Sequence, residues 1–544
     1  MPSACAPFPT GYFALVLHAH LPFVHHPEQP RFLEEDWLFE ALSETYLPLL
    51  DMLDGLAHDH IPFHLNLSLS PTLLSMLADP LLQQRYVQYL DARLHALQGE
   101  RKRTRNDPYY YPLAVFYSER YAKLRARFVE QDQLNVIPAF RRHQDNGYLE
   151  ILTSGATHGY FPLLATHPEN LYAQVSMAVR THTRFFGRPP RGIWLPECAY
   201  VPGVDTLLAE FGIDYFILDT HGVLHADPRP KYGVHRPLRT PGGPAVFGRD
   251  YETSKQVWSG EVGYPGNFFY REFYRDAGFD IDATHMQPLR HAGLAGYTGL
   301  KYHRITGKGR HKEPYQPEWA REQAALHAED FLQQRQQQLQ WLSTRLDQPP
   351  IIVAPYDAEL FGHWWFEGPL WIDFVARGLH ARSDGLQSVT LSSYLDDCGE
   401  LQTAQPTESS WGAGGFHAVW LNESNDWIYP YLQQATQRML DLVARHPDAV
   451  GTPRLMLDQA ARELLLAQAS DWAFILHSAT AMDYAKGRFQ QHIHRFNRLA
   501  KMIENDTPDE NYLGLMASRD NLFPDMDYRI FQRRPWLGSH DNGH

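Results

Sequence analysis

The chain has 544 residues, more than one ordinary domain holds, so we expect a large domain with one or more attachments. Apolar residues make up 44% and charged residues 21%, which fits a globular protein with an ample core. The net charge of −14 argues against a nucleic-acid partner, because phosphate binding draws on clustered Lys and Arg. The one dense basic run, residues 101–105, is predicted to be a solvated loop.

The three cysteines, Cys5, Cys198 and Cys398, lie far apart and form no CxxC pair. This spacing excludes a cysteine zinc site and a disulfide framework, and it suits a reducing cytoplasm. No signal-peptide pattern is evident, and no apolar run approaches the roughly 18 residues of a membrane span. We therefore expect a cytoplasmic protein with no membrane partner. A monomer is favoured, although the sequence does not fix the oligomeric state.

Short apolar runs recur along the chain, and several end in polar residues. They cover residues 13–17, 63–69, 149–152, 192–195, 215–218 and 351–354, with helical patterns between several of them, such as 35–56 and 169–186. Alternation of strand and helix predicts a parallel α/β sheet or barrel. Polar residues at the carboxyl ends of about seven or eight such strands are typical of a (β/α) barrel.

The pattern divides the chain into three parts. We assign residues 1–79 and 148–400 to the barrel, and residues 80–147 to a polar, helical insertion over its mouth. After residue 400 the strand pattern stops, and residues 401–544 are predicted to form a helical C-terminal domain. Its helices are expected at 429–446 and 453–469, followed by one long helix whose apolar positions keep a 3.6-residue period over 475–503.

Two carboxylates stand where strands meet turns. Glu197 ends Gly-Ile-Trp-Leu-Pro-Glu, and Asp357 begins Asp-Ala-Glu-Leu-Phe-Gly-His-Trp-Trp. A lone acid is ordinarily a solvated surface group or a helix cap, but these two lie in rigid, aromatic contexts. In a barrel mouth, one carboxylate can attack an anomeric carbon while the other protonates the leaving oxygen. The many aromatic residues would suit a sugar ligand, although aromatic side chains also fill cores.

His18 and His20 alternate at the end of the first strand. Such a pair can bind zinc or donate hydrogen bonds to sugar hydroxyls. A zinc site would indicate a metal-dependent polysaccharide deacetylase. Because the sequence offers no obvious third ligand, we predict no metal site.

Five stretches of the sequence resemble glycoside hydrolase family 57, most closely its 1,4-α-glucan branching enzymes. They are residues 18–22, 147–158, 191–200, 354–368 and 470–472, in family order, so the resemblance covers nearly the whole chain. It implies a (β/α)7 barrel, an α-1,4-glucan substrate and a retaining mechanism without a metal or other cofactor. It makes Glu197 the nucleophile and Asp357 the proton donor.

The same resemblance implies a set of substrate-binding residues. Asp471 matches a binding aspartate, although an acid in the first turn of a helix, after the candidate cap Ser470, is favoured by the helix dipole anyway. Thr480 stands where some relatives carry a glutamine contact, which puts that contact in doubt. The expected binding residues are His18, His20, Trp37, His158, Trp194, Trp258, Arg271, Gly299, Trp411, Asp471, Trp472 and Thr480.

Three activities fit the predicted acid pair. We expect a branching enzyme, which cuts an α-1,4-glucan and moves the chain to a 6-hydroxyl. An α-amylase or a 4-α-glucanotransferase would use the same carboxylates with another acceptor, whereas the intact pair argues against a non-catalytic glucan-binding protein. Branching requires that the intermediate survive water. Relatives use a mobile loop with an aromatic residue near its tip, and the candidate here is residues 228–244, which hold Tyr232.

Overall fold

A computed structural model describes residues 11–259, 262–281, 286, 289, 296–307, 309, 311–382 and 385–534. Cys5, which entered the disulfide prediction, lies outside the described residues. No described helix is both long and apolar enough to span a bilayer.

The centre of the molecule is a curled parallel sheet. Its strands are β1 (Gly11–Ala19), β2 (Leu65–Leu69), β3 (Leu149–Ser154), β4 (Gly192–Trp194), β5 (Tyr215–Leu218), β7 (Ala245–Gly248) and β8 (Ile351–Asp357). The order is β7-β5-β4-β3-β2-β1-β8, all parallel. Two short strands join it: β6 (Leu238–Arg239) runs antiparallel to β7, and β9 (Leu386–Ser388) pairs with β1.

The two edge strands β7 and β8 approach each other, so the sheet curls towards closure. The N–H of Asp250, two residues beyond β7, donates to the carbonyl oxygen of Val353 in β8 at 2.9 Å. The strands are buried on both faces, as expected of a parallel sheet covered by helices. The predicted (β/α)-barrel class is thereby confirmed, whereas β7 was missed because it is a four-residue run inside a segment rich in Gly and Pro.

Helices cover the sheet between consecutive strands. Several begin with proline in the first turn and a capping side chain, as in α3, where the Ser70 hydroxyl accepts from the N–H of Leu73. The helices of the barrel segments are α1 (Glu35–Ala41), α2 (Leu47–His58), α3 (Pro71–Leu77), α7 (Phe161–Leu164), α8 (Pro168–Phe186), α9 (Val204–Glu210), α10 (Thr220–Leu224), α11 (Tyr251–Trp258), α12 (Ala277–Asp280), α14 (Pro317–Ser343), α15 (Gly368–Ala381) and α16 (Leu391–Asp397).

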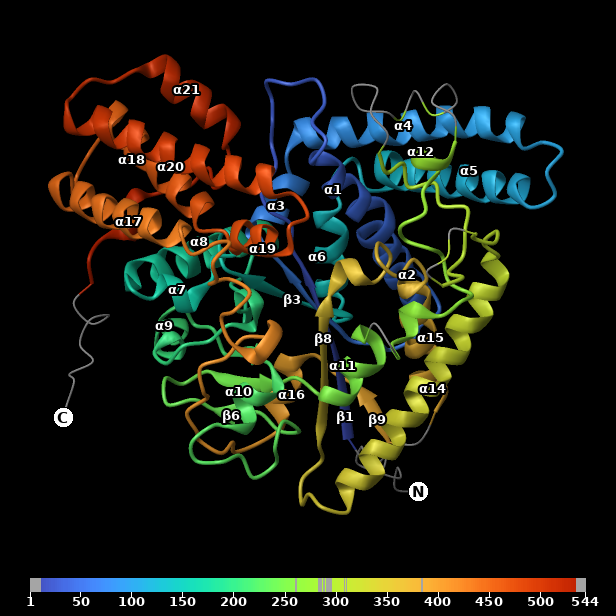
Figure 1. The fold of residues 1–544 in the computed structure, drawn as a ribbon. Coiled ribbons are helices and arrows are strands. Elements are labelled where there is room, and N and C mark those ends of the chain that lie inside the picture. The colour runs from blue at the N-terminus through green and yellow to red at the C-terminus, as the bar shows by residue number, and fades with distance from the viewer. Residues whose placement is uncertain are drawn as a thin grey trace.

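The segment predicted as an insertion is helical. It contains α4 (Pro80–Arg103), α5 (Tyr110–Ala126) and α6 (Ile137–Asp145), and α4 packs against α5. Figure 1 shows this pair at the end of the molecule towards which β8 points, on the side away from the C-terminal helices. The domain boundaries at 79, 147 and 400 stay predictions.

The C-terminal part is helical, as predicted, from residue 428 onwards. Its helices are α17 (Ile428–Arg445), α18 (Gly451–Ala467), α19 (Ser470–Ser478), α20 (Met482–Glu504) and α21 (Glu510–Arg519). The single long helix expected over 475–503 is wrong, because Ala479 adopts a left-handed conformation with φ 56° and separates α19 from α20. Residues 401–427 lack an α-helix and run back along the barrel instead.

The candidate lid lies at the wrong end of the barrel. The hydroxyl of Tyr232 donates to Asp347 at 2.7 Å, and the carbonyl of His235 accepts from the N–H of Ile351. Both contacts are at the start of β8, whereas Asp357 ends that strand. The assignment of residues 228–244 as a lid over the catalytic residues is therefore wrong: the segment descends from β5 to the amino end of the sheet.

The break at Ala479 yields a test of local strain. A left-handed conformation costs an L-residue about 1–2 kcal/mol, so Ala479→Gly should stabilise the protein by up to about 1 kcal/mol. Ala122→Gly, at an exposed site inside α5, is the matched control and should destabilise by about 1 kcal/mol. Urea denaturation would measure both. A destabilised Ala479→Gly variant would show that the break does not strain the backbone.

Candidate active site

The carboxyl ends of the parallel strands bring the predicted chemistry together. His18 lies near the end of β1, Glu197 follows β4, and Asp357 ends β8, paired in register with His18. They line a cavity of about 560 Å³, to which the C-terminal domain contributes Asp471. The size suits a ligand of several rings. Barrel enzymes place their catalytic groups at this end, because the loops after the strands converge there.

Glu197 sits in a strained turn with its carboxylate held from two distant segments. Its φ is 62°, a left-handed conformation that non-glycine residues rarely adopt. One carboxylate oxygen accepts from the indole N–H of Trp411 at 2.8 Å, and the other from the hydroxyl of Ser470 at 3.3 Å. Burial raises the pKa of Glu197 to about 7, and the charge of Asp471 adds to this, while the Trp411 and Ser470 hydrogen bonds oppose it.

Asp357 faces the same cavity in a different electrostatic setting. Burial raises its pKa well above the usual value, and the carboxylates Glu359 and Glu197 raise it further, whereas Arg249 opposes them. Among the described residues, no N–H or O–H group donates to the Asp357 carboxyl. Of the two acids, Glu197 is the one built to hold a negative charge, and Asp357 is the one built to hold a proton.

Three histidines form a polar wall beside Glu197. His18 and His158 share a hydrogen bond between their Nε2 atoms at 2.9 Å, and Ser470 contacts Nδ1 of His158 at 2.9 Å. Burial keeps the pKa of His18 and of His158 well below the usual value, so both imidazoles are neutral. His20 Nε2 lies 3.1 Å from the Asp471 carboxylate. Neutral imidazoles and a carboxylate are suited to sugar hydroxyls.

Two histidines of this wall, together with Asp471, have the geometry of a cation-binding site. One ligand atom from each of His20, His158 and Asp471 lies within 4.8 Å of the other two. The third ligand that the sequence did not reveal is therefore present in space. In this structure the ring nitrogens are hydrogen-bonded to His18, Ser470, Ser70 and Asp471.

The remaining predicted residues separate into those at the cavity and those beneath it. Trp258 and Trp411 line it, and Trp258 is 39% exposed. Trp194 is fully buried below the cavity, where its indole stacks on His18 at 4.6 Å. Trp472 is buried in the helical domain, with its N–H donating to the carbonyl of Leu466.

Like Trp194 and Trp472, four further predicted residues lie outside the set that lines the cavity. Arg271 is 3% exposed and paired with Glu44 at 2.7 Å, and Gly299 donates its N–H to Asp276. Trp37 packs edge-on against Tyr484, and Thr480 is exposed just beyond α19. A direct role in binding for these four stays a prediction.

The structure adds residues that the sequence did not single out. Arg249 directly follows β7 and was missed together with that strand. Glu359 lies two residues beyond Asp357, accepts a hydrogen bond from the Tyr46 hydroxyl, and has a pKa raised to about 7 by burial. Its position in the motif that begins at Asp357 was a signal by which the sequence could have identified it as a site residue. Phe474 enters from α19, one turn after Asp471.

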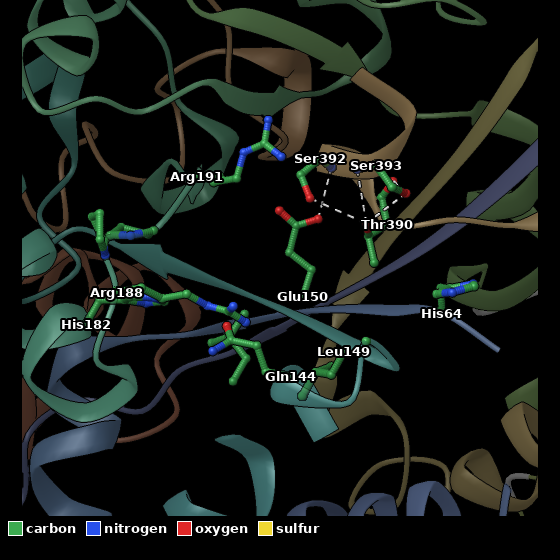
Figure 2. A pocket seen from close by; sticks show the side chains of 14 residues that line it. His64, Gln144, Leu149, Glu150, His182, Arg188, Arg191, Thr390, Ser392 and Ser393 are labelled. Atoms are coloured by element: carbon green, nitrogen blue, oxygen red, sulfur yellow. Dashed lines mark hydrogen bonds between the residues drawn. The ribbon is translucent and has the colours of Figure 1, made fainter. Parts of the chain in front are cut away.

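A second hollow, of about 400 Å³, lies at the opposite end of the sheet (Figure 2). It is lined by residues at the starts of strands, such as His64 before β2 and Arg191 before β4. Figure 2 shows Glu150 pointing towards Ser392, whose N–H donates to its carboxylate at 3.0 Å. Among the described lining residues Glu150 is the only carboxylate, so this hollow lacks an acid pair.

The cavity at the carboxyl ends thus combines a stabilised carboxylate, a second acid with a raised pKa, exposed indoles and neutral imidazoles. These features define an enzyme class that cleaves or transfers glycosidic bonds through two carboxyl groups. A family model described as glycosyl hydrolase family 57 matches residues 14–401, and one described as 1,4-alpha-glucan branching enzyme, C-terminal, matches residues 431–531. The chain belongs to glycosyl hydrolase family 57.

Individual relatives cover nearly the whole chain. The 1,4-alpha-glucan branching enzyme TK1436 of Thermococcus kodakarensis is 35% identical over 94% of this chain and 77% of its own. The alpha-amylase AmyC from Thermotoga maritima superposes with a TM-score of 0.90, at 41% identity over 96% of this chain and 99% of its own. A GH57-type branching enzyme from Pyrococcus horikoshii superposes with a TM-score of 0.87, at 34% identity over 96% of this chain and 97% of its own.

The electrostatics of Glu197 predict the acidic limb of the pH profile. In its predicted role as the nucleophile, Glu197 must be ionised, so kcat/KM should fall as the pH drops through about 7. Asp357, with its raised pKa, sets a basic limb at higher pH. Asp471→Asn removes a negative charge that raises the pKa of Glu197. The acidic limb should therefore move to lower pH, whatever happens to the maximal rate.

The exposed Asp483→Asn, the same substitution on α20, is the matched control and should leave the limb in place. A limb that stays fixed in Asp471→Asn, or moves to higher pH, would refute the assigned charge interaction.

Proposed function

We propose that this protein is a 1,4-α-glucan branching enzyme that works by retaining transglycosylation. The observation that carries the proposal lies in the C-terminal domain. The segment matching the branching-enzyme C-terminal model supplies Asp471 and Phe474 to the cavity, and its Ser470 contacts the Glu197 carboxylate. The domain named for branching thus contributes side chains to the cavity that holds both acids.

In the first step, a Glu197 oxygen attacks the anomeric carbon of an α-1,4-linked glucan. The bond to the leaving oxygen breaks, and Asp357 gives that oxygen its proton. Trp411 and Ser470 favour the ionised carboxylate that the attack requires. The raised pKa of Asp357 keeps the proton available.

In the second step, the Asp357 carboxylate takes the proton of an acceptor 6-hydroxyl. The acceptor oxygen attacks the anomeric carbon and releases Glu197, which creates an α-1,6 branch with net retention of configuration. His18, His20, His158 and Asp471 hold the hydroxyls of the sugar bound to Glu197. The polymer is a glycogen-like α-glucan, and the compartment is the cytoplasm, where the free thiols of Cys198 and Cys398 would remain reduced.

A hydrolytic α-amylase is the second candidate. It is favoured by the 41% identity and TM-score of 0.90 to a protein titled an alpha-amylase. The same two carboxyl groups would act, with water in place of the 6-hydroxyl.

Product analysis on amylose separates the two activities. A branching enzyme should lower iodine staining while few reducing ends appear, and isoamylase should then release short chains from the product. Reducing ends that rise in step with the loss of staining, with no chains released by isoamylase, would make the protein an amylase.

Azide rescue tests the roles of the two acids. Glu197→Ala should abolish turnover of amylose and, with azide and α-maltosyl fluoride, form the β-azide, because azide replaces the nucleophile. Asp357→Ala should reduce turnover of amylose by about 10²–10⁴-fold. With azide it should form the α-azide, through the intact intermediate on Glu197. The opposite pairing of anomers would reverse the assignment.

A chelator tests the cation-binding geometry at His20, His158 and Asp471. Because these groups are satisfied by hydrogen bonds, branching activity should survive dialysis against EDTA. Activity that disappears on dialysis and returns with zinc would show that the histidine wall holds a catalytic metal.

A further inference from the structure

The segment that follows Asp357 carries Trp364, which lies at the catalytic cavity and stacks on Phe273. We call this aromatic pair the aromatic step. Trp364 lines the cavity, yet 51% of it is exposed. The ring of Phe273, from a different part of the chain, stacks on it at 4.2 Å with an interplanar angle of 26°. One face of the indole is therefore backed by protein, while much of its surface remains open beside the cavity.

This step rests on a buried ionic support. Glu44, 4% exposed, accepts from Arg271 at 2.7 Å with one oxygen and contacts Nδ1 of His363 at 2.7 Å with the other. Although burial opposes its ionisation, Arg271 and His363 hold the pKa of Glu44 well below the usual value. His363 in turn meets the Phe273 ring edge-on at 5.2 Å. The support thus fixes the loop before any ligand binds.

Beyond the stacked pair, the outer side of Phe273 is also occupied. The Lys301 ammonium lies 3.9 Å from the centre of the Phe273 ring. Phe273 thus contacts both the Lys301 ammonium and the indole of Trp364, and these contacts hold the phenyl ring on which the indole stacks. A flat, fixed and partly open indole is the surface on which the C–H face of a sugar ring packs.

The position of the step relative to the acids indicates which sugar it meets. Asp357, Glu359, Leu360 and Trp364 line the cavity from one continuous segment, whereas His158 of the histidine wall lies 3.7 Å from the Glu197 carboxylate. The proton donor faces the oxygen of the leaving chain, and the acceptor later occupies the same place. A sugar on Trp364 therefore belongs to the leaving or accepting chain, not to the unit bonded to Glu197.

On the basis of the proposed function, we propose that Trp364 is the platform for the acceptor glucan and thereby sets the ratio of transfer to hydrolysis. Phe273 and the Glu44–Arg271–His363 support hold it in place. A chain docked on the indole brings its hydroxyl to the anomeric carbon and displaces water. Without the platform, the intermediate still forms, but water takes a larger share of it. Arg271 then acts as a positioning residue rather than a direct sugar ligand.

The test separates the formation of the intermediate from its fate. α-Maltosyl fluoride needs no glucan leaving group, so fluoride release without acceptor reports the first step and hydrolysis. Adding maltohexaose and counting transfer products of either linkage reports the acceptor site. Trp364→Ala should raise the acceptor KM about tenfold, the effect of losing about 1.4 kcal/mol of stacking, and raise the share of hydrolysis, while fluoride release without acceptor falls much less than transfer does.

Trp364→Phe should restore most of the acceptor affinity, because a smaller ring still stacks. Trp341→Ala, which removes a 56% exposed indole from α14 outside the cavity lining, is the matched control and should change neither readout. Equal loss of fluoride release and transfer in Trp364→Ala would overturn the proposal, and so would an unchanged acceptor KM. Counting either linkage keeps this result independent of whether the wild-type products contain branches.

Discussion

The ionised carboxylate of Glu197, taken out of water, is the constraint on which the rest of this site depends. Burial raises its pKa to about 7, so the protein must supply donors that water would otherwise provide. It does so with the Trp411 indole and the Ser470 hydroxyl, which come from segments more than two hundred residues away. The irregular stretch after the barrel and the first turn of α19 are therefore as necessary to the nucleophile as its own strand.

The same requirement explains why the helical domain is broken where it is. A continuous helix over residues 475–503 would tie the direction of α19 to that of α20. The left-handed Ala479 frees α19 to line the cavity with Asp471 and Phe474 and to place Ser470 against Glu197. The strained turns at His158 and Glu197 serve the same end from the barrel side. Three of the left-handed non-glycine residues of the described chain thus lie in segments that surround the Glu197 carboxylate.

The buried carboxyl groups of this molecule occur in two different electrostatic environments. At the catalytic cavity, burial and then the neighbouring carboxylates Glu359 and Glu197 raise the pKa of Asp357, which keeps a proton in reach. Beneath Trp364, Glu44 is instead paired with Arg271 and contacted by His363, and stays ionised. The first arrangement supplies reactivity and the second supplies rigidity. Arg271, expected from sequence to touch substrate, belongs to the second.

The sequence by itself determined the barrel class, most of its strands and the two acids, because a short apolar run ending in a polar residue is a local signal. It also specified His18, His20 and His158 as groups at strand ends. It could not reveal β7 or Arg249, since a four-residue strand among glycines and prolines has no period. Nor could it place residues 228–244, because a loop's direction depends on what it packs against. Only the tertiary structure decided that Ser470 and Trp411 meet Glu197, that Arg271 lies under the aromatic step, and that the histidines join Asp471 in one wall. Those contacts join residues hundreds of positions apart, and their energies exist only once burial has removed the water between them.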